Sequence, residues 1–391
     1  MKKVSAWRRS IGDTMSGSRR RLRLMGLILT WTIVLVSLAS IFLFGVYIHP
    51  PRSSIACSVF SSGGCAVPEQ HPSQELSDDQ IAARVVLKEI LKIPPIQSKN
   101  PKIAFMFLAS GSLPSEEIWD NFFRGHEGRF SVYVHSSNEK PVHVSPYFEG
   151  RDIRSEKVVW GKISMVDAEK RLLANALVDP DNQQFVLLSE SCIPLHSFQY
   201  VYHYLIYTNV SFIDCILDPG PHGVGRYSEC MFPEVKIDDF RKASQWFSLK
   251  RQHAVMAISD SFYYRKFSLY CRPNMDGEHC YSDENYLATL FHVNADPAGI
   301  SNWAVTHVDW SEANWHPKTY MAPDVTHELL KDIAVCVLYL FLLLSLKRAM
   351  VTPCSWNGKK RPCFLFARKF QPETLDKLMY IFSNHMTSST P

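Results

Sequence analysis

The fold of this 391-residue chain is decided by the stretch KIAFMFL at residues 102–108. Its six consecutive apolar residues fit a short strand buried on both faces, as in the middle of a parallel sheet. Working outward, similar apolar runs predict further strands, and helical spacing predicts helices between them. The expected strands are 131–135, 158–160 and 185–188, and the expected helices are 115–123 and 164–177. This alternation predicts an α/β fold with an open, mainly parallel sheet and flanking helices.

A polar cluster follows the last of these strands and is the first candidate for chemistry. Ligands of open α/β sheets bind beyond the carboxyl ends of the strands. Ser189 and Glu190 begin the sequence SESCIP, which ends in a proline turn at Pro194. A turn with a purely structural role has the same pattern. Ser189 and Glu190 are therefore candidate substrate-binding residues.

Aromatic and basic side chains gather farther along, in QWFSLKR at residues 245–251. Trp246 can stack on a sugar ring, and Lys250 can reach a hydroxyl or an acid group of a substrate. The alternative is a core tryptophan flanked by solvated charges. Both side chains are candidate substrate-binding residues.

Two adjacent acids occur in YSDENYLATL at residues 281–290. Ser282 predicts a helix N-cap, which places Asp283 and Glu284 in the first turn. The helix dipole alone favours acids there, without any catalytic role. The dipole also lowers a carboxylate pKa, which opposes a general-base role unless burial raises it. The residues alone thus leave capping and catalysis as competing interpretations.

A group of cations lies near the C-terminus, in CSWNGKKRPC at residues 354–363. Its two cysteines close a loop that presents the three cations of residues 359–361, and two more follow at 368–369. In a nearly neutral body such a loop is a candidate anion site. A solvated charge run is the more ordinary interpretation.

The positive charge of the chain is concentrated at its N-terminus. Residues 1–23 carry eight Lys or Arg and one acid, whereas the whole chain has a net charge of +4. The remainder is therefore nearly neutral, which argues against a nucleic-acid-binding body. Ordinary globular composition, with 46% hydrophobic residues, also excludes a disordered or fibrous chain.

The uncharged residues 24–48 predict a membrane anchor, because as a helix they exceed the roughly 30 Å of a bilayer core. The positive-inside rule then predicts a cytosolic basic tail at 1–23 and a lumenal or extracellular body. A cleaved signal peptide is the alternative, although its apolar stretch is usually about 7–15 residues. Pro- and Ser-rich residues 49–100 predict a stem, and Asn209 begins a glycosylation sequon that fits the lumenal side.

Taken together, these segments resemble the core-2/I-branching β-1,6-N-acetylglucosaminyltransferase family, and above all its plant branch of Golgi type II proteins. The resemblance covers roughly residues 100–385 and keeps the family's order of motifs. Its segments are KIAFMF at 102–107, FFRGHEG at 122–128, VLLSESCIP at 186–194, SQWF at 244–247, YSDE at 281–284 and FARKF at 366–370.

The resemblance implies a GT-A-like glycosyltransferase domain at 101–391 that binds a UDP-sugar. It implies inverting transfer of N-acetylglucosamine or glucuronic acid to a hydroxyl of a glycan or proteoglycan. One carboxylate suffices for this reaction, since it removes the acceptor proton while the hydroxyl attacks the sugar. The family's base corresponds to Glu284.

The resemblance also implies how the leaving diphosphate is held. The family uses no metal or other cofactor and relies on basic side chains, which correspond to Arg361 (or the adjacent Lys360) and Lys369. It implies a disulfide between Cys354 and Cys363, and Golgi membrane localisation with the body in the lumen. The Asp-x-Asp sequence at 179–181 precedes a strand and is interpreted as a turn.

The sequence departs from the family at the uncharged run 333–346, part of an atypical insert at 333–350. It is short for a membrane span of about 20 residues. A buried helix, an exposed patch and a mistaken gene-model segment are the three interpretations, and we favour the last. For the whole chain, the alternative function is a catalytically inactive carbohydrate-binding or scaffold protein of the same fold.

Overall fold

The computed structural model describes most of the chain after residue 98, with short gaps, and only a few residues before it. The described residues are 31–38, 40, 87, 90, 98–275, 278–294, 299–312, 316–335, 354–356 and 359–388. Contacts divide the chain into two units, Met1–Gln74 and Glu75–Pro391.

Of the first unit, the structure describes a helical segment at residues 31–38 and residue 40. Among the residues described here, no helix has both the length and the apolar character that crossing a membrane requires. Most of the anchor predicted at 24–48 and of the stem predicted at 49–100 lies outside the described residues. Both therefore stay predictions.

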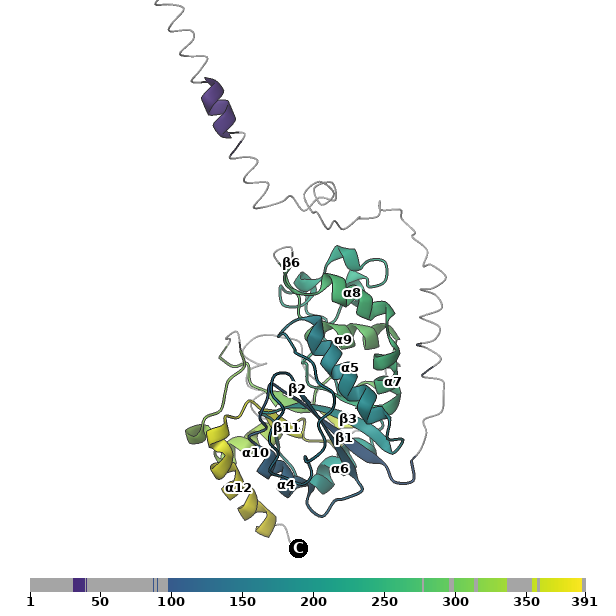
Figure 1. The fold of residues 1–391 in the computed structure, drawn as a ribbon, viewed down its shortest axis with the longest axis vertical. Coiled ribbons are helices and arrows are strands. Elements are labelled where there is room, and N and C mark those ends of the chain that lie inside the picture. The colour runs from purple at the N-terminus through teal and green to yellow at the C-terminus, as the bar shows by residue number, and fades with distance from the viewer. Residues whose placement is uncertain are drawn as a thin grey trace, which may run out of the picture. The chain divides into compact units, whose positions relative to one another are not determined.

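The second unit is built on a four-stranded sheet with the order β2-β1-β3-β5 (Figure 1). β1 (Lys102–Ala109) pairs in parallel with β2 (Phe130–Ser136) and with β3 (Asn182–Ser189), and β5 (Ser248–Lys250) pairs antiparallel with β3. Every residue of β1 after the first is buried. The predicted mainly parallel α/β sheet with flanking helices is thus confirmed, with β5 as an antiparallel strand.

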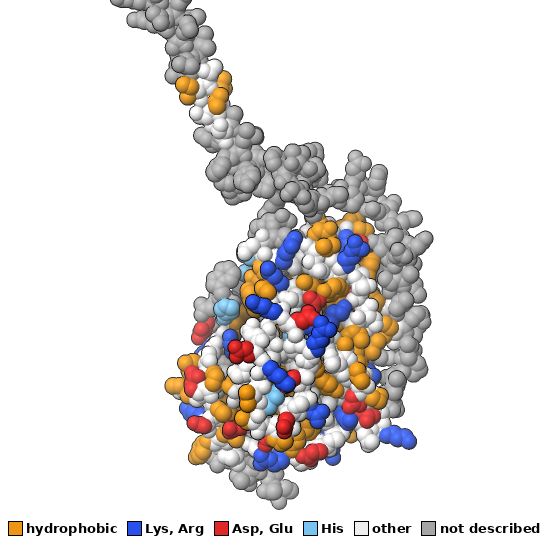
Figure 2. All heavy atoms as spheres, in the orientation of Figure 1, with side chains coloured by type: hydrophobic (Ala, Val, Ile, Leu, Met, Phe, Trp, Pro, Cys, Tyr) orange, Lys and Arg blue, Asp and Glu red, His pale blue; other side chains and the backbone are white. Residues whose placement is uncertain are grey.

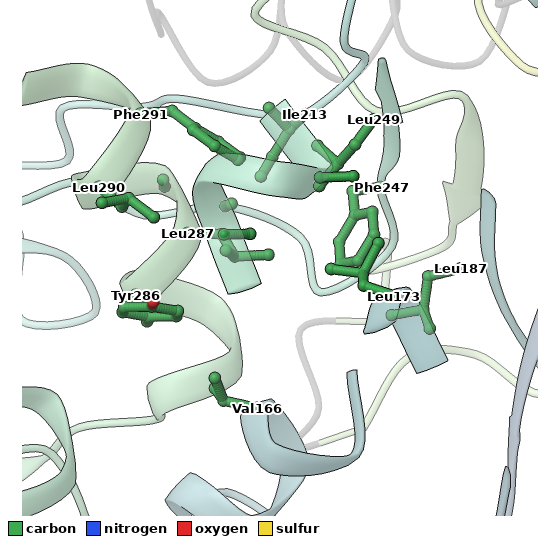
Figure 3. Close-up of a cluster of buried hydrophobic side chains, with 14 of the residues drawn as sticks. Val166, Leu173, Leu187, Ile213, Phe247, Leu249, Tyr286, Leu287, Leu290 and Phe291 are labelled. Atoms are coloured by element: carbon green, nitrogen blue, oxygen red, sulfur yellow. The ribbon is translucent and has the colours of Figure 1, made fainter. Parts of the chain in front are cut away.

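Helices cover both faces of this sheet because successive side chains of β1 point into two different cores. Met106 faces the core formed with α5 (Ile163–Leu177), α7 (Arg251–Ser259) and α9 (Ser282–Asn294). Phe105 faces the core formed with α4 (Glu116–Phe123) and α6 (Phe198–Ile206). Figure 3 shows part of the first core, in which side chains of α5, β3, β5 and α9 meet.

The strand predicted at 158–160 is wrong. The backbone N–H of Val158 donates to the hydroxyl of Ser137 at 2.8 Å, and that of Val159 donates to the hydroxyl of Ser164 at 2.9 Å. Serine hydroxyls thus take the donors that a sheet ladder needs, and the segment turns into α5 instead. The sequence did not predict β5, which takes the fourth place in the sheet.

A small second sheet adds the C-terminal segments to this domain. β11 (Phe366–Arg368) pairs antiparallel with β4 (Ile193–Pro194) and in parallel with β8 (Thr306–Val308). α10 (His327–Val335) and α12 (Leu375–Ser388) pack beside it around a third core. The pairing of β11 with β4 brings the basic C-terminal segment next to the turn after β3.

The remaining described elements are short and lie between these. They are η1 (Val224–Arg226), η2 (Glu229–Met231), η3 (Ile237–Asp239), α8 (Phe262–Tyr270), β6 (Pro273–Met275), β7 (Glu278–His279), η5 (Ala322–Asp324), β9 (Ser355–Trp356), β10 (Lys359–Lys360) and η6 (Pro372–Thr374).

The atypical insert predicted at 333–350 begins inside α10. Ile333 is 1% exposed and packs in the third core with Phe370 and Leu378. The start of the uncharged run is therefore a buried helix end. Residues 336–350 lie outside the described residues, and the three interpretations stay open for them.

The described surface carries charges of both signs. Figure 2 shows Lys and Arg side chains interspersed with Asp and Glu on the face that is drawn. Two disulfides lie in the described part of the chain, Cys271–Cys280 and the Cys354–Cys363 bridge that the resemblance implies. Disulfides form and persist in oxidising compartments.

Candidate active site

The N-terminal end of α9 is held from two sides. The Cys271–Cys280 disulfide closes the chain just before the helix. The hydroxyl of Ser282 donates to the carbonyl of Cys271 at 2.8 Å and is buried, so it ties the start of α9 to the segment before it. The first turn of α9, which carries Asp283 and Glu284, is therefore fixed in place.

Three carboxyl groups meet at this turn. Asp283 has a buried Oδ1 without a hydrogen-bond partner, and burial, followed by the charge of Glu284, raises its pKa to about 7. Glu169 of α5 is 1% exposed, and burial, followed by the charge of Asp283, raises its pKa well above the ordinary value. Gln245 donates to Glu169 at 2.9 Å. This region therefore holds two carboxyl groups whose neutral forms are favoured by burial, one of them with an oxygen that has no partner.

Glu284 is the member of this group whose side chain reaches solvent. Its side chain is 25% exposed, and its Oε2 accepts a hydrogen bond from an Nη1 of Arg226 at 2.5 Å. The guanidinium of Arg226 also lies 4.7 Å from the centre of the Tyr281 ring. Sequence reasoning missed Arg226, because a contact between residues 58 positions apart leaves no local pattern.

Trp246 lies near the same acids but is buried rather than open. It is 5% exposed, and the guanidinium of Arg368 lies 4.3 Å from the centre of its ring. A face occupied by a cation is not open to a sugar, so this packing does not favour the stacking role of Trp246, which stays a prediction. Trp246 instead holds Arg368, which lies close enough to Glu190 for their charges to interact.

The turn after β3, at residues 189–192, is held by hydrogen bonds within it and from the segment after β11. Ser189 is 2% exposed, and its hydroxyl is 3.0 Å from that of Ser191. The backbone N–H of Phe370 donates to the carbonyl of Ser191 at 3.1 Å. Ser189 therefore shapes the turn from inside, which corrects its predicted direct contact with substrate, and Glu190 is the partly exposed acid of this turn.

The structure separates Lys250 from the other candidates. In the antiparallel register of β5, Lys250 lies opposite Gln184, near the start of β3, and it is 7% exposed. Phe247 lies beside Leu187, so the chain approaches the carboxyl end of β3 only at Trp246. The predicted substrate contact of Lys250 stays a prediction, and this position does not favour it, because an extended strand carries its two ends to opposite edges of the sheet.

The two cations predicted to bind diphosphate have different surroundings. Lys369 follows β11 next to Ser191, and its ammonium forms no ion pair with any described residue. Arg361 lies 5.2 Å from the ring centre of Tyr204 in α6, on the other face of the sheet from α9. Lys369 is therefore free to bind an anion beside the turn after β3, whereas Arg361 is already stacked.

An exposed aromatic residue that the sequence placed in a strand lies next to the N-terminal end of α9. Trp160 is 57% exposed, and its ring centre is 5.0 Å from that of Tyr281. Gly161 permits this approach, since a Cβ there would lie 2.7 Å from the Tyr281 ring. The candidate surface for stacking on a sugar is therefore Trp160 rather than Trp246.

The side chains of the candidate site form a continuous series in which each interacts with the next. Tyr281, Arg226 and Glu284 form one end, and Asp283 and Glu169 follow. From Glu169 the series continues through Gln245 and Trp246 to Arg368 and Glu190. In the part of the chain that the structure describes, no three His, Cys, Asp or Glu side chains form a metal-binding cluster.

The fold and these motifs match a known family. The family model named Core-2/I-Branching enzyme matches residues 103–334. The chain belongs to the core-2/I-branching enzyme family. A curated relative, Glycosyltransferase BC10 of Oryza sativa subsp. japonica, is 36% identical over 310 residues, which is 71% of this chain and 75% of that protein.

Membership of the core-2/I-branching family confirms the predicted resemblance and makes this chain a member of a glycosyltransferase family. The matched range contains Glu284, Arg226 and Trp246, and it ends before Arg361 and Lys369. The acid end of the site therefore lies within the family match. Of the two predicted cations, Lys369 is brought next to the turn after β3 by the pairing of β11 with β4.

Proposed function

We propose that this chain transfers a sugar from a UDP-sugar to a hydroxyl of a glycan with inversion, and that Glu284 is the general base. The observation that carries the proposal is the position of the Glu284 carboxylate. It projects from a fixed helical turn, reaches solvent, and has one oxygen bound to Arg226. The other oxygen, Oε1, accepts no hydrogen bond from any described residue and is available to an incoming hydroxyl.

In the proposed step, Oε1 of Glu284 takes the proton of the acceptor hydroxyl. The acceptor oxygen forms a bond to the anomeric carbon from the face opposite UDP. The bond from that carbon to the phosphate oxygen breaks, and UDP leaves with the electron pair. One carboxylate is enough, because inversion needs a single displacement.

The leaving diphosphate gains negative charge, so fixed positive charge near it stabilises the transition state. Lys369 supports this role best, because its ammonium is unpaired among the described residues and lies beside the turn after β3. Arg361 is the second predicted contact, and it would have to leave the Tyr204 ring to reach a ligand at that turn. We propose that these cations act without a metal.

The sugar itself needs apolar and polar contacts. Trp160 offers an exposed ring beside Tyr281, and sugar rings pack well on such faces. The buried, unpartnered Oδ1 of Asp283 is a polar group that a bound hydroxyl would satisfy. We propose N-acetylglucosamine or glucuronic acid as the transferred sugar and a glycan or proteoglycan as the acceptor.

We further propose a Golgi type II membrane location with the body in the lumen. The basic residues 1–23 followed by the uncharged residues 24–48 support it. Two disulfides in the described part of the domain support an oxidising compartment. Asn209 is exposed, so its sequon is accessible to glycosylation.

The decisive test replaces Glu284 by Gln in the full-length chain. Hydrolysis of UDP-N-acetylglucosamine and of UDP-glucuronic acid, with water as acceptor, is measured as UDP release. We expect Glu284→Gln to lose about 100-fold to 10,000-fold in rate, while UDP affinity stays within about threefold. The matched control is Glu229→Gln, an exposed glutamate outside the site, which keeps the wild-type rate.

Full activity in Glu284→Gln would contradict the assignment of the base. Binding of UDP without any turnover by the wild-type chain would instead support the inactive scaffold. The same assay in excess EDTA tests the metal: the rate is expected to stay unchanged, and its loss would show that a divalent ion is required.

A further inference from the structure

The pairing of Glu284 with Arg226 has features of a built contact rather than of a surface ion pair. Arg226 is 7% exposed, although Arg is rarely buried without a specific partner. One guanidinium nitrogen binds Oε2 of Glu284, and the Tyr281 ring lies beneath the guanidinium. The backbone N–H of Glu284 in turn donates to the carbonyl of Tyr281 at 3.2 Å. The guanidinium of Arg226, the ring of Tyr281 and the carboxylate of Glu284 therefore form one cluster of side chains in contact.

The loop that delivers Arg226 is closed by its own backbone. The N–H of Val224 donates to the carbonyl of Asp218 at 2.7 Å, and the N–H of Arg226 donates to the carbonyl of Gly223 at 2.9 Å. A Cβ at Gly223 would lie 2.1 Å from the carbonyl oxygen of Asp218, so only glycine fits there. The loop thus fixes where Arg226 leaves the backbone.

We propose that Arg226 is a positioning residue for the base: it holds Oε2 of Glu284 so that Oε1 faces the acceptor hydroxyl, and it places a buried positive charge beside that carboxylate. This inference rests on the proposed role of Glu284. The groups that face Glu284 among the described residues are Asp283 on α9, Arg226 and Tyr281 from the preceding segments, and Glu169 from α5 beyond Asp283.

The physical reason is the burial of this turn, which penalises charged carboxylates. Asp283 and Glu169 both lie in environments that favour their neutral forms. A cation close to a carboxylate favours the charged form of that carboxylate. Arg226 supplies that charge from a buried position, where screening by solvent and salt is weak.

The test is the pH dependence of kcat/KM for hydrolysis of UDP-N-acetylglucosamine and of UDP-glucuronic acid by the full-length chain. In Arg226→Met we expect the acidic limb to move up by about one pH unit or more, because an opposite charge at this distance is worth about 1–3 pKa units. We expect kcat near neutral pH to fall by about 100-fold through misorientation of the base, with UDP affinity within about threefold.

Two variants separate positioning from mere folding. Arg226→Lys keeps the charge, so its acidic limb should stay within about 0.3 pH units of wild type even where kcat falls. Arg241→Met removes another arginine that reaches α9, through His292, and should leave the limb unmoved. If Arg226→Met fails to fold, Arg226→Gln takes its place with the same expectation.

An acidic limb that is unmoved in both uncharged variants would overturn the inference, and so would wild-type kcat in them. Either result leaves the assignment of Glu284 intact if Glu284→Gln is inactive. Full activity of Glu284→Gln, by contrast, defeats the proposed base itself.

Discussion

The two ends of β3 both carry charged side chains, but these are paired at the amino end and partly unpaired at the carboxyl end. At its amino end, Lys102 binds Asp179 at 2.9 Å, and Arg251 donates to the carbonyls of Asp179 and Asn182, each at 2.9 Å. At its carboxyl end, the Nε of Arg368 is buried without a partner. The buried Oδ1 of Asp283, farther along the site, also has none.

This difference teaches how to distinguish structural charge from functional charge. The amino end has a hollow of about 300 Å³ lined by Lys102, Phe130 and Tyr147. The ammonium of Lys102, however, is already paired with the carboxylate of Asp179. Buried polar groups without partners cost free energy, so a fold retains them mainly where a ligand completes them. By that criterion the carboxyl end is the candidate site, even though the hollow lies at the other end.

The largest effect expected from this comparison is on nucleotide binding. Lys369→Ala should weaken UDP binding by about 10-fold to 100-fold, because a hydrogen bond to a charged group is worth about 1.5–3 kcal/mol. Lys102→Ala, at the amino end, should change UDP affinity by less than about twofold. Titration calorimetry with UDP measures both, and equal losses in the two variants would erase the distinction between the ends.

The second effect is on stability and concerns Asp283. Because its pKa is raised to about 7 in the fold, the folded state binds a proton that the unfolded state releases above about pH 4. Stability from this group is therefore present at acidic pH and is lost as the pH rises towards 7. The stability advantage of Asp283→Asn over wild type should be smallest below about pH 4 and should grow by about 1–3 kcal/mol between pH 5 and pH 8.

Thermal unfolding of the full-length chain at the two pH values measures this difference. Asp238→Asn, which alters an exposed acid, is the matched control and should leave the melting temperature unchanged at both. A variant at 283 that is no more stable than wild type at alkaline pH would show that the carboxylate is well solvated or paired.

The smallest effect is expected at the amino end. Burial alone would raise the pKa of Asp179, but hydrogen bonds from Lys102 and from the backbone of Asp181 outweigh it and hold the pKa below its ordinary value. Asp179→Asn should therefore cost about 0.2–1 kcal/mol at neutral pH, and the cost should vanish as acid protonates the wild-type carboxylate. Urea unfolding at neutral and acidic pH tests this, and a cost that persists in acid would show that the ion pair is not its source.

Much of the fold was predictable because apolar runs report burial directly. The strand predicted at 103–108 is β1, and the helix predicted at 164–177 is α5 to within one residue. The strand predicted at 158–160 failed because two serine hydroxyls, one of them distant in sequence, take its backbone donors. β5 was missed because three residues give no periodicity to read.

The candidate site was predictable only in part. The acidic first turn of α9 and the cation after β11 were identified from local motifs. The different surroundings of Trp246 and Lys250 were not predictable, since the same short segment places one under a guanidinium and the other at the far edge of the sheet. Arg226 and Trp160 carried no local signal, because their significance lies in what they contact.

The sequence by itself determined the α/β alternation, the family motifs and an acid at the start of a helix, because each depends on neighbouring residues. Only the tertiary structure decided which cation pairs with Glu284, which acid is buried and which tryptophan is open. Those outcomes depend on how sheet register and helix packing bring together residues that are tens of positions apart, and that placement determines desolvation and charge pairing.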